Sequence, residues 1–227
     1  MMDTGLSGFI KKLPLEKRVL LAIDNIAEGV YVIHLERKHD FLPGQVVGIS
    51  LDHSIPARLY SICSGKDESK LSILFNIKPD GLLSPQLAAL GRGDSVLVSR
   101  PFGAFLGDEQ PSWWIASGTG VAPYRSMIRS GMDKNKVLIH GGRMANSFYF
   151  QDEMKVRLGD RYIRCCSQET GEGLYHGRLT NWIREQETLP LANQYFLCGS
   201  AEMVVEVRDI LISKGVELDQ IMSEIYF

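Results

Sequence analysis

The sequence lacks the features that mark membrane and nucleic-acid-binding proteins. No apolar run among the 227 residues approaches the roughly 18–20 residues that cross a bilayer as a helix, so no membrane insertion is predicted. The formal net charge of −2 gives no global basic field that would attract nucleic acid. What remains is the composition of an ordinary globular protein, 44% apolar and 23% charged.

Cysteine is scarce as well. The four cysteines are Cys63, Cys165, Cys166 and Cys198, and they form no CxxC pair and no spacing suited to zinc or an iron–sulfur cluster. We therefore predict no metal site. The wide scatter is typical of free thiols, and the first residues lack the basic-then-apolar pattern of a secretory signal, which together favour a cytoplasmic location.

The chain changes rhythm near its middle, and its length is comfortable for two domains that each bury a core. Residues 1–106 contain short strand-like runs between turn residues, a pattern typical of a β-barrel or sandwich. Residues 107–227 alternate apolar runs with helical patterns, which indicates a doubly wound parallel sheet. Strands are expected over 19–23, 30–35, 45–49, 59–63, 71–77, 95–98, 113–116, 137–140, 162–166 and 195–198. Helices are expected over 84–90, from near 123, and over 150–158, 180–186 and 202–214.

Two segments of the first half could bind phosphate. The string Arg58-Leu59-Tyr60-Ser61 places a guanidinium and a stacking ring on one face of a strand. The segment 79–85 turns at a glycine into a helix that we expect to begin with Ser84 as N-cap and Pro85 at N1. Free amides at such a start suit a pyrophosphate. Taken alone, each segment reads equally as an ordinary strand or a well-capped helix.

In the second half, small residues stand where strands are expected to end. The turn 118–123 and the string Cys198-Gly199-Ser200 each join a strand to a helix, where α/β sheets bind ligands. Arg143 and Arg178 follow glycines at neighbouring positions of this kind, and two guanidinium groups there could clamp a ribose phosphate. Cys198 has no cationic neighbour in sequence that would make it a nucleophile. Each Arg alone is more often a solvated surface residue.

Taken in order, these motifs resemble the ferredoxin–NADP⁺ reductase superfamily and, within it, the bacterial flavodoxin/ferredoxin–NADP⁺ reductases. The resemblance covers nearly the whole chain. It rests on the flavin motif R-x-Y-S at 58–61, the pyrophosphate loop and helix at 79–90, the nicotinamide-side turn GTGxAP at 118–123, C-G-x-x-x-M at 198–203 and the terminus E-x-Y-aromatic at 224–227. It implies an antiparallel FAD-binding β-barrel in residues 1–106. It also implies an NADP(H)-binding α/β domain with an aromatic tail in residues 107–227.

The resemblance also implies residue roles. Arg58 would pair with the FAD pyrophosphate, Tyr60 would pack on the isoalloxazine, and Ser61 would hydrogen-bond near flavin N5. Tyr226 would stack on the flavin face where nicotinamide must dock, with Phe227 extending that cover. The phosphates would meet amides and a hydroxyl of Gly81, Leu82, Leu83 and Ser84. The nicotinamide side would involve Gly118, Thr119, Gly199 and Met203. The catalytic set would be Ser61, Cys198, Glu224 and Tyr226, with Glu224 a possible proton relay.

One departure bears on cofactor choice. Where NADPH-using members carry a Ser/Thr-Arg pair after the third strand, this chain has Ser167 and Gln168. Arg143 and Arg178 match two further arginines of the subfamily's phosphate clamp. One lost guanidinium removes a charge-assisted contact worth roughly 1.5–3 kcal/mol. We therefore expect NADPH as the substrate, with weaker discrimination against NADH than the full motif would give.

The implied reaction passes a hydride between NADP(H) and FAD, and single electrons to or from ferredoxin or flavodoxin. Such carriers are typically acidic, so a local basic patch is expected somewhere on the surface. Three alternatives stay open. They are an electron-transfer subunit of a multicomponent oxidoreductase, which the missing cysteine cluster disfavours, a flavin-free binding module, and an NAD(P)H-dependent flavin reductase.

Overall fold

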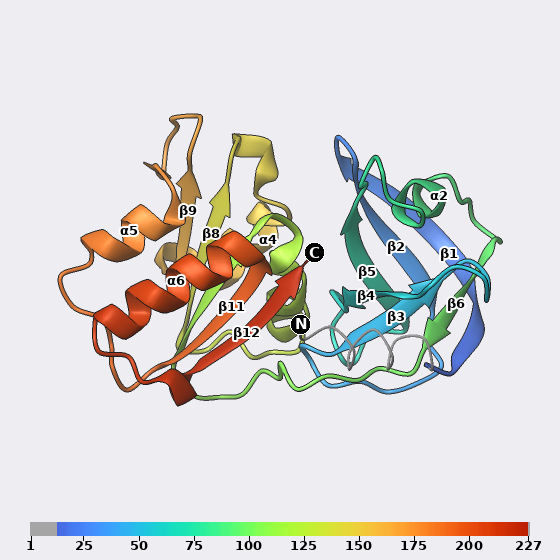
Figure 1. Cartoon of the computed structure of the whole chain (residues 1–227), viewed down its shortest axis with the longest axis horizontal. Helices are drawn as coiled ribbons and strands as arrows, with labels where there is room; N and C mark the ends of the chain where they lie inside the picture. The colour runs from blue at the N-terminus through green and yellow to red at the C-terminus, as the bar shows by residue number, and fades with distance from the viewer. Residues whose placement is uncertain (1–12, 227) are drawn as a thin grey trace, which may run out of the picture. The chain divides into compact units, whose positions relative to one another are not determined.

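The computed structural model describes residues 13–226, and the chain divides into two compact units, Met1–Leu106 and Gly107–Phe227 (Figure 1). The first unit is built on an antiparallel sheet and the second on a parallel sheet, so the predicted fold class is confirmed. No helix within residues 13–226 is long and apolar enough to cross a membrane. Phe227, for which a role beside the flavin is predicted, lies outside the described residues.

The first unit is a six-stranded antiparallel barrel in the order β4-β3-β6-β1-β2-β5. Its strands are β1 (Leu15–Ala27), β2 (Val30–Glu36), β3 (Val46–Ser50), β4 (Arg58–Ser61), β5 (Lys70–Asn76) and β6 (Ser95–Ser99). The two end strands meet where Ile62, just after β4, forms an antiparallel bridge with Ile73 of β5. This bridge favours a barrel over the sandwich that the strand spacing also allowed.

Strand β1 is longer than its apolar run predicts. Its first five residues pair with β6, and from Leu20 onward it pairs with β2. A register shift between Leu20 and Ala22 marks the point where the strand leaves one partner for the other, as bulges do at barrel corners. Inward-facing side chains such as Leu20, Ile33 and Ile73 are fully buried and form the barrel core.

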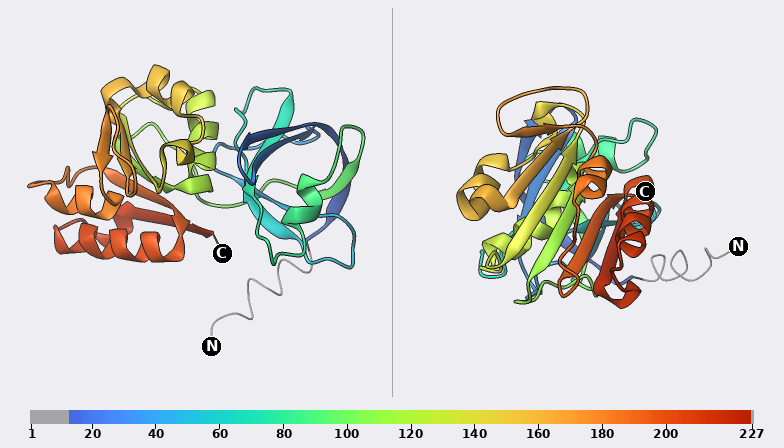
Figure 2. Two further views of the ribbon diagram at one scale, coloured as in Figure 1. Left: turned by 90° about the horizontal axis from the view of Figure 1, so that it is seen from above. Right: turned by 90° about the vertical axis from the view of Figure 1, so that its left-hand side faces the viewer.

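The second unit is a six-stranded sheet in the order β10-β9-β8-β7-β11-β12, with every neighbouring pair parallel. Its strands are β7 (Ser112–Ser117), β8 (Lys136–Gly142), β9 (Tyr162–Cys166), β10 (Leu174–His176), β11 (Gln194–Ser200) and β12 (Ile221–Tyr226). Its helices are α3 (Ala122–Arg129), α4 (Gln151–Leu158), α5 (Leu179–Glu185) and α6 (Ala201–Ser213). Short 3₁₀ turns span Gly118–Val121, Ala145–Ser147, Gly159–Arg161 and Leu218–Gln220. Helices α5 and α6 cover one face of the sheet, and α3 and α4 cover the other (Figure 2).

Two strands of this sheet and one helix cap differ from prediction. Strand β10 has only three residues, and β12 contains Ser223 and Glu224, so neither shows a periodic apolar pattern. In the barrel, α2 (Ser84–Ala88) begins with Leu83 as its N-cap, so the prediction that Ser84 caps it is wrong. The Ser84 hydroxyl instead accepts a hydrogen bond from the Lys78 N–H at 2.9 Å. That bond ties the hydroxyl to the loop before the helix rather than to an amide of the helix itself.

Candidate functional site

In the barrel, the predicted flavin strand is β4, which pairs with β3 so that Tyr60 lies opposite Val47 and Arg58 opposite Ile49. Arg58 is exposed, Tyr60 is partly buried and Ser61 is buried. Alternation along the strand puts Arg58 and Tyr60 on one face and Ser61 on the other. The guanidinium is therefore accessible to a ligand, while the ring beside it is anchored.

The Tyr60 ring is held by aromatic contacts. It meets the edge of the Phe75 ring with 6.2 Å between centroids and 72° between planes. Phe75 in turn stacks on Tyr31 at 5.7 Å. Burial raises the pKa of the Tyr60 hydroxyl to about 12, against the opposing charge of Arg58. The phenol is thus neutral at physiological pH, and the ring is a rigid surface that another flat group can stack on.

The loop before α2 is a tight turn in which Gly81 N–H donates to the Lys78 carbonyl at 2.8 Å. A Cβ atom at position 81 would lie 3.0 Å from that carbonyl and 3.4 Å from the Ser84 hydroxyl, so a side chain fits poorly there. Leu82 is 69% exposed, whereas Leu83 is buried and anchors the loop. The first amides of a helix have no partner within it. The loop therefore presents backbone donors on a fixed frame.

In the second unit, the predicted nicotinamide turn packs directly on the end of β11. Gly118 adopts a left-handed conformation with φ of 53°. A Cβ atom on Gly120 would overlap the backbone carbonyl of Cys198, and one on Gly199 would overlap the Ser117 hydroxyl. That hydroxyl accepts a hydrogen bond from the Ser200 N–H at 3.2 Å. Glycine is thus required for the two strand ends to approach each other.

His140, which sequence reasoning assigned only to a strand, holds the same turn from the side. Its Nε2–H donates to the Gly118 carbonyl at 3.3 Å, and its Nδ1 accepts from the Tyr162 hydroxyl at 3.0 Å. The ring is fully buried and meets Phe148 edge-on at 5.3 Å. Burial lowers the pKa of His140 to about 4, partly opposed by its bond to Gly118. The imidazole is therefore neutral at physiological pH.

The C-terminal strand brings three of the predicted catalytic residues together. In the pairing of β11 with β12, Cys198 lies opposite Glu224 and Ser200 opposite Tyr226. Burial raises the pKa of the Cys198 thiol well above its usual value, Glu224 raises it further, and a hydrogen bond with the Tyr226 side chain lowers it. Cys198 is therefore a protonated, buried thiol, and the prediction that it is no activated nucleophile agrees with this environment. Thr119 is partly buried in the turn that packs on the same strand end.

The loops after β8 and β9 meet further along the same carboxyl edge. Backbone N–H groups of Ser167 and Gln168 donate to the carbonyls of Gly142 and Arg143 at 3.1 and 3.0 Å. The side chains of Arg143 and Gln168 are exposed. Arg178 precedes α5 as its N-cap and forms an ion pair with Glu202 in the first turn of α6 at 2.7 Å. The predicted phosphate-binding residues thus gather at one edge, together with a carboxylate that sequence reasoning did not include.

Met203 and Ser200 shape the start of α6. The Ser200 hydroxyl accepts from the Met203 N–H at 3.3 Å and caps the helix. The Met203 side chain is buried in the core beneath α5 and α6. Glu202 carries no sequence signal of its own, since an acidic residue in a first helical turn is ordinary. His140 could have been suspected, because it directly precedes the Gly141-Gly142 pair that ends β8.

Comparison with known proteins places these features in a family. Residues 114–209 match the oxidoreductase NAD-binding domain family. The chain is 34% identical over 188 residues to a flavodoxin/ferredoxin–NADP reductase of Shigella flexneri, covering 72% of this chain and 76% of that protein. It is 30% identical over 219 residues to a ferredoxin–NADP reductase of Pseudomonas aeruginosa, covering 81% and 83%. The fold matches a ferredoxin–NADP⁺ reductase from Neisseria gonorrhoeae, solved with FAD and NADP, with a TM-score of 0.85, 19% identity and coverage of 94% and 99%.

Proposed function

Since the chain belongs to the flavodoxin/ferredoxin–NADP reductase family, we propose that it exchanges a hydride with NADP(H) through bound FAD and single electrons with ferredoxin or flavodoxin. The observation that carries the proposal is the strand-end cluster of the second unit. There the turn Gly118–Val121 packs on Cys198, which is paired with Glu224 beside Tyr226. Parallel α/β sheets bind ligands outside the carboxyl ends of their strands.

The barrel residues fit a flavin dinucleotide. An exposed guanidinium at Arg58 and the backbone donors around Gly81 suit a pyrophosphate, and the anchored Tyr60 ring suits a flat heterocycle. Arg58, Leu82, Leu83 and Ser84 would hold the phosphates, and Ser61 would lie near the reacting nitrogen. When bound, the flavin supplies the change between two-electron and one-electron chemistry.

In the second unit, Gly118, Thr119, Gly199 and Met203 would form the wall on the nicotinamide side. Tyr226 would cover the flavin face and move aside when nicotinamide enters, with Phe227 extending this cover. Cys198 would contribute a neutral side chain rather than a nucleophile, because burial and Glu224 keep its thiol protonated. Glu224 would hold or pass a proton. Placement and exclusion of water would supply most of the protein's contribution.

Arg143, Ser167, Gln168 and Arg178 would receive the cofactor's ribose phosphate. Guanidinium groups recognise phosphate through paired N–H donors. We favour NADPH over NADH, with the discrimination weakened by Gln168.

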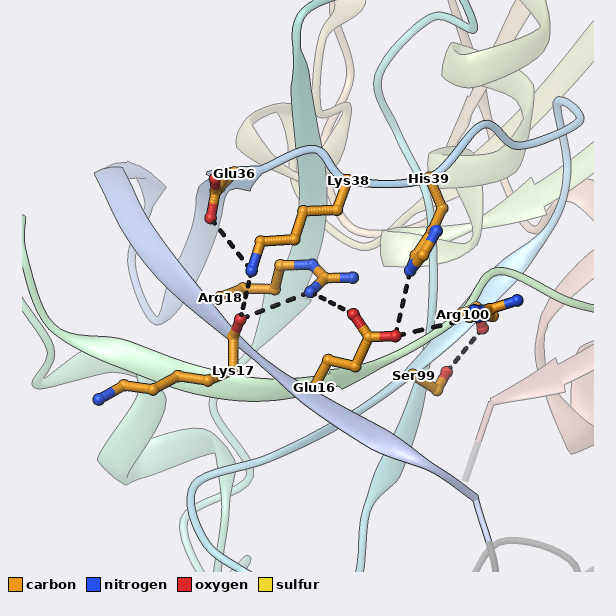
Figure 3. Close-up of polar contacts among 8 residues, drawn as sticks. All are labelled: Glu16, Lys17, Arg18, Glu36, Lys38, His39, Ser99 and Arg100. Atoms are coloured by element: carbon orange, nitrogen blue, oxygen red, sulfur yellow. Dashed lines mark hydrogen bonds and ion pairs between the residues drawn. The ribbon is translucent and has the colours of Figure 1, made fainter.

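For the protein partner, we propose a basic surface on the barrel, defined by the side chains of Lys17, Lys38 and Arg100 with His39 beside them, while the buried Arg18 lies beneath it (Figure 3). Two carboxylates lie among these side chains. Glu16 contacts Arg18 at 2.9 Å, His39 at 3.3 Å and Arg100 at 3.9 Å, and Glu36 lies 3.7 Å from Lys38. Arg100 is 74% exposed and Lys38 42% exposed, so both can reach a docked acidic carrier. The surface lies near the candidate flavin strand, because Ser99 binds the Gly48 N–H and Gly48 pairs with Leu59 of β4.

The decisive experiment is anaerobic stopped-flow reduction of the purified protein, followed by flavin absorbance with NADPH and NADH in parallel. Rapid bleaching by NADPH supports the proposal, and faster bleaching by NADH would reassign the cofactor. A colourless protein, or flavin that neither nucleotide reduces, contradicts the reductase function. We also propose a cytoplasmic location, which the four free thiols favour because a reducing compartment keeps cysteines unpaired.

The partner surface has its own test. Replacing both Lys38 and Arg100 by Glu is expected to slow reduction of ferredoxin or flavodoxin and to flatten its salt dependence, while flavin reduction by NADPH stays unchanged. The matched control is Lys155→Glu combined with Arg208→Glu, two exposed cations of the second unit. Equal slowing in both double variants would mean that net charge rather than this surface controls docking.

A further inference from the structure

The Arg178 guanidinium is not alone at the phosphate-binding edge. Its Nη2 lies 2.7 Å from Oε1 of Glu202, and the side chains are 56% and 74% exposed. The hydrogen bond and the charge of Glu202 raise the pKa of Arg178 above its usual value. The pair joins the residue that precedes α5 to the first turn of α6. A dianionic phosphate that binds Arg178 must therefore compete with a carboxylate already paired to it.

A second carboxylate lies at the same edge. Glu169 accepts a hydrogen bond from the Ala145 N–H, and Ala145 follows Arg143 by two residues. The Glu169 carboxylate therefore lies against the loop that carries Arg143. Gln168, which precedes Glu169 in the loop after β9, adds only a neutral, exposed side chain. The edge thus offers two guanidinium groups and two carboxylates, which is a poor electrostatic balance for a group with two negative charges.

We propose that Glu202 is a specificity-determining residue that weakens recognition of a nucleotide 2′-phosphate by occupying Arg178. The inference rests on the proposed function, which places the ribose phosphate near Arg143 and Arg178. A dinucleotide without that phosphate does not need Arg178 for this contact, so Glu202 leaves its affinity nearly unchanged. Glu202 therefore reduces the difference in affinity between NADPH and NADH, and this reduction adds to the one that Gln168 causes.

Magnitude decides whether such competition matters. An exposed ion pair shifts an equilibrium by about 1.5-fold to fivefold, so a phosphate can displace Glu202 at modest cost. The displaced carboxylate then remains close to the phosphate and repels it, which adds to that cost. Removing the charge of Glu202 ends both effects, and the gain should fall on the phosphate-bearing ligand alone.

The chain offers a matched control in the next ion pair between the same helices. Arg184 of α5 contacts Glu206 of α6 at 2.6 Å. Glu206 lies one helical turn further from the sheet edge than Glu202, and it acts on Arg178 through its charge without the hydrogen bond that Glu202 makes. Glu206→Gln removes the same charge from the same helix, so the difference between the two variants isolates direct pairing with Arg178.

The test measures binding of 2′,5′-ADP and 5′-AMP to the flavin-loaded full chain by calorimetry at low ionic strength. We expect Glu202→Gln to tighten 2′,5′-ADP about threefold to tenfold and to change 5′-AMP by less than about twofold. Glu206→Gln should increase the affinity for 2′,5′-ADP by less than half of the fold-change expected for Glu202→Gln. Arg178→Ala should weaken 2′,5′-ADP and make a further Glu202→Gln change ineffective. Thermal unfolding of each variant checks that the exposed substitutions leave the fold intact.

The outcomes distinguish failure of the role proposed for Glu202 from failure of the proposed phosphate site. If Arg178→Ala weakens 2′,5′-ADP but Glu202→Gln has no effect, or tightens both ligands equally, the specificity role of Glu202 is overturned while the proposed site stands. If Arg178→Ala leaves 2′,5′-ADP unchanged, or if the unaltered protein binds neither ligand, the phosphate site of the proposed function is wrong and the inference falls with it.

Discussion

Gly120 lies against the backbone carbonyl of Cys198, in a space that a single Cβ atom would already overfill. The residues belong to the turn after β7 and to the end of β11, neighbouring strands that pair in parallel. The atom in the way is backbone, so it cannot swing aside as a flexible side chain would. The strand-end cluster therefore depends on glycine at position 120.

Gly120→Ala is expected to destabilise the protein by about 1–3 kcal/mol or more, because the strand ends must separate to admit the methyl group. The same displacement should slow flavin reduction by NADPH. Chemical unfolding and stopped-flow reduction measure the two effects. Gly91→Ala serves as control, since its nearest neighbour would lie 3.9 Å away and the change should be nearly neutral. A Gly120→Ala protein with unaltered stability would show that the turn relaxes freely.

Arg58→Ala is expected to weaken FAD binding about tenfold to 150-fold, the range for loss of one charge-assisted hydrogen bond. The exposed guanidinium makes few folding contacts, so stability of the flavin-free barrel should hardly change. Titration of the flavin-free protein with FAD, followed by fluorescence quenching, gives the affinity. Arg92→Ala, an exposed arginine of the same barrel, is the control. Equal affinity in both variants would remove Arg58 from the pyrophosphate site.

The sequence predicted those parts of the fold that local pattern controls. Tyr162–Cys166 forms β9 over the expected residues, because four of its five residues are apolar or strand-favouring and they follow a polar turn. Strand β12 escaped prediction because its residues become a strand only by pairing with β11, a contact distant in sequence. The prediction that Ser84 caps α2 was wrong for a related reason, since the Ser84 hydroxyl accepts a hydrogen bond from Lys78 rather than from its own helix.

For the site, the sequence motifs located the strand ends but not the residues that pack against them. The approach of Gly120 to Cys198 is a packing fact that agrees with the glycine-rich string without being readable from it. The pairing of Arg178 with Glu202 requires α5 and α6 to lie side by side, which no local signal specifies. Partners brought together by tertiary packing are therefore the main part of the site that sequence reasoning could not supply.

Lys136 is a fully buried lysine at the start of β8, and its ammonium contacts the segment that precedes β7. Its ammonium binds Asp108 at 3.2 Å, hydrogen-bonds to the Gln110 carbonyl and lies 5.6 Å from the Trp114 ring centroid. Asp108→Asn should destabilise the unit by about 1–3 kcal/mol, because a buried charge loses its counter-ion. Lys136→Met should be milder, since an apolar side chain of similar size needs no partner. Urea unfolding ranks the two, and the reverse order would show that Lys136 stabilises through its charge.

His140 gives the fold a dependence on pH whose sign follows from its environment. Burial lowers the pKa of His140 from 6.5 to about 4, so between these values the unfolded chain binds a proton that the folded chain does not. Stability from this group is complete above pH 6.5 and is lost as pH falls toward 4, by about 3 kcal/mol in all.

We expect His140→Gln, whose amide can still donate to the Gly118 carbonyl, to lose less stability than the unaltered protein between pH 7 and pH 5. Urea unfolding at the two pH values measures the difference, and carboxylates that titrate in the same range cancel because both proteins share them. Identical losses in both proteins would mean that His140 is protonated in the folded state near its ordinary pKa, and that its bond to the turn carries no pH dependence.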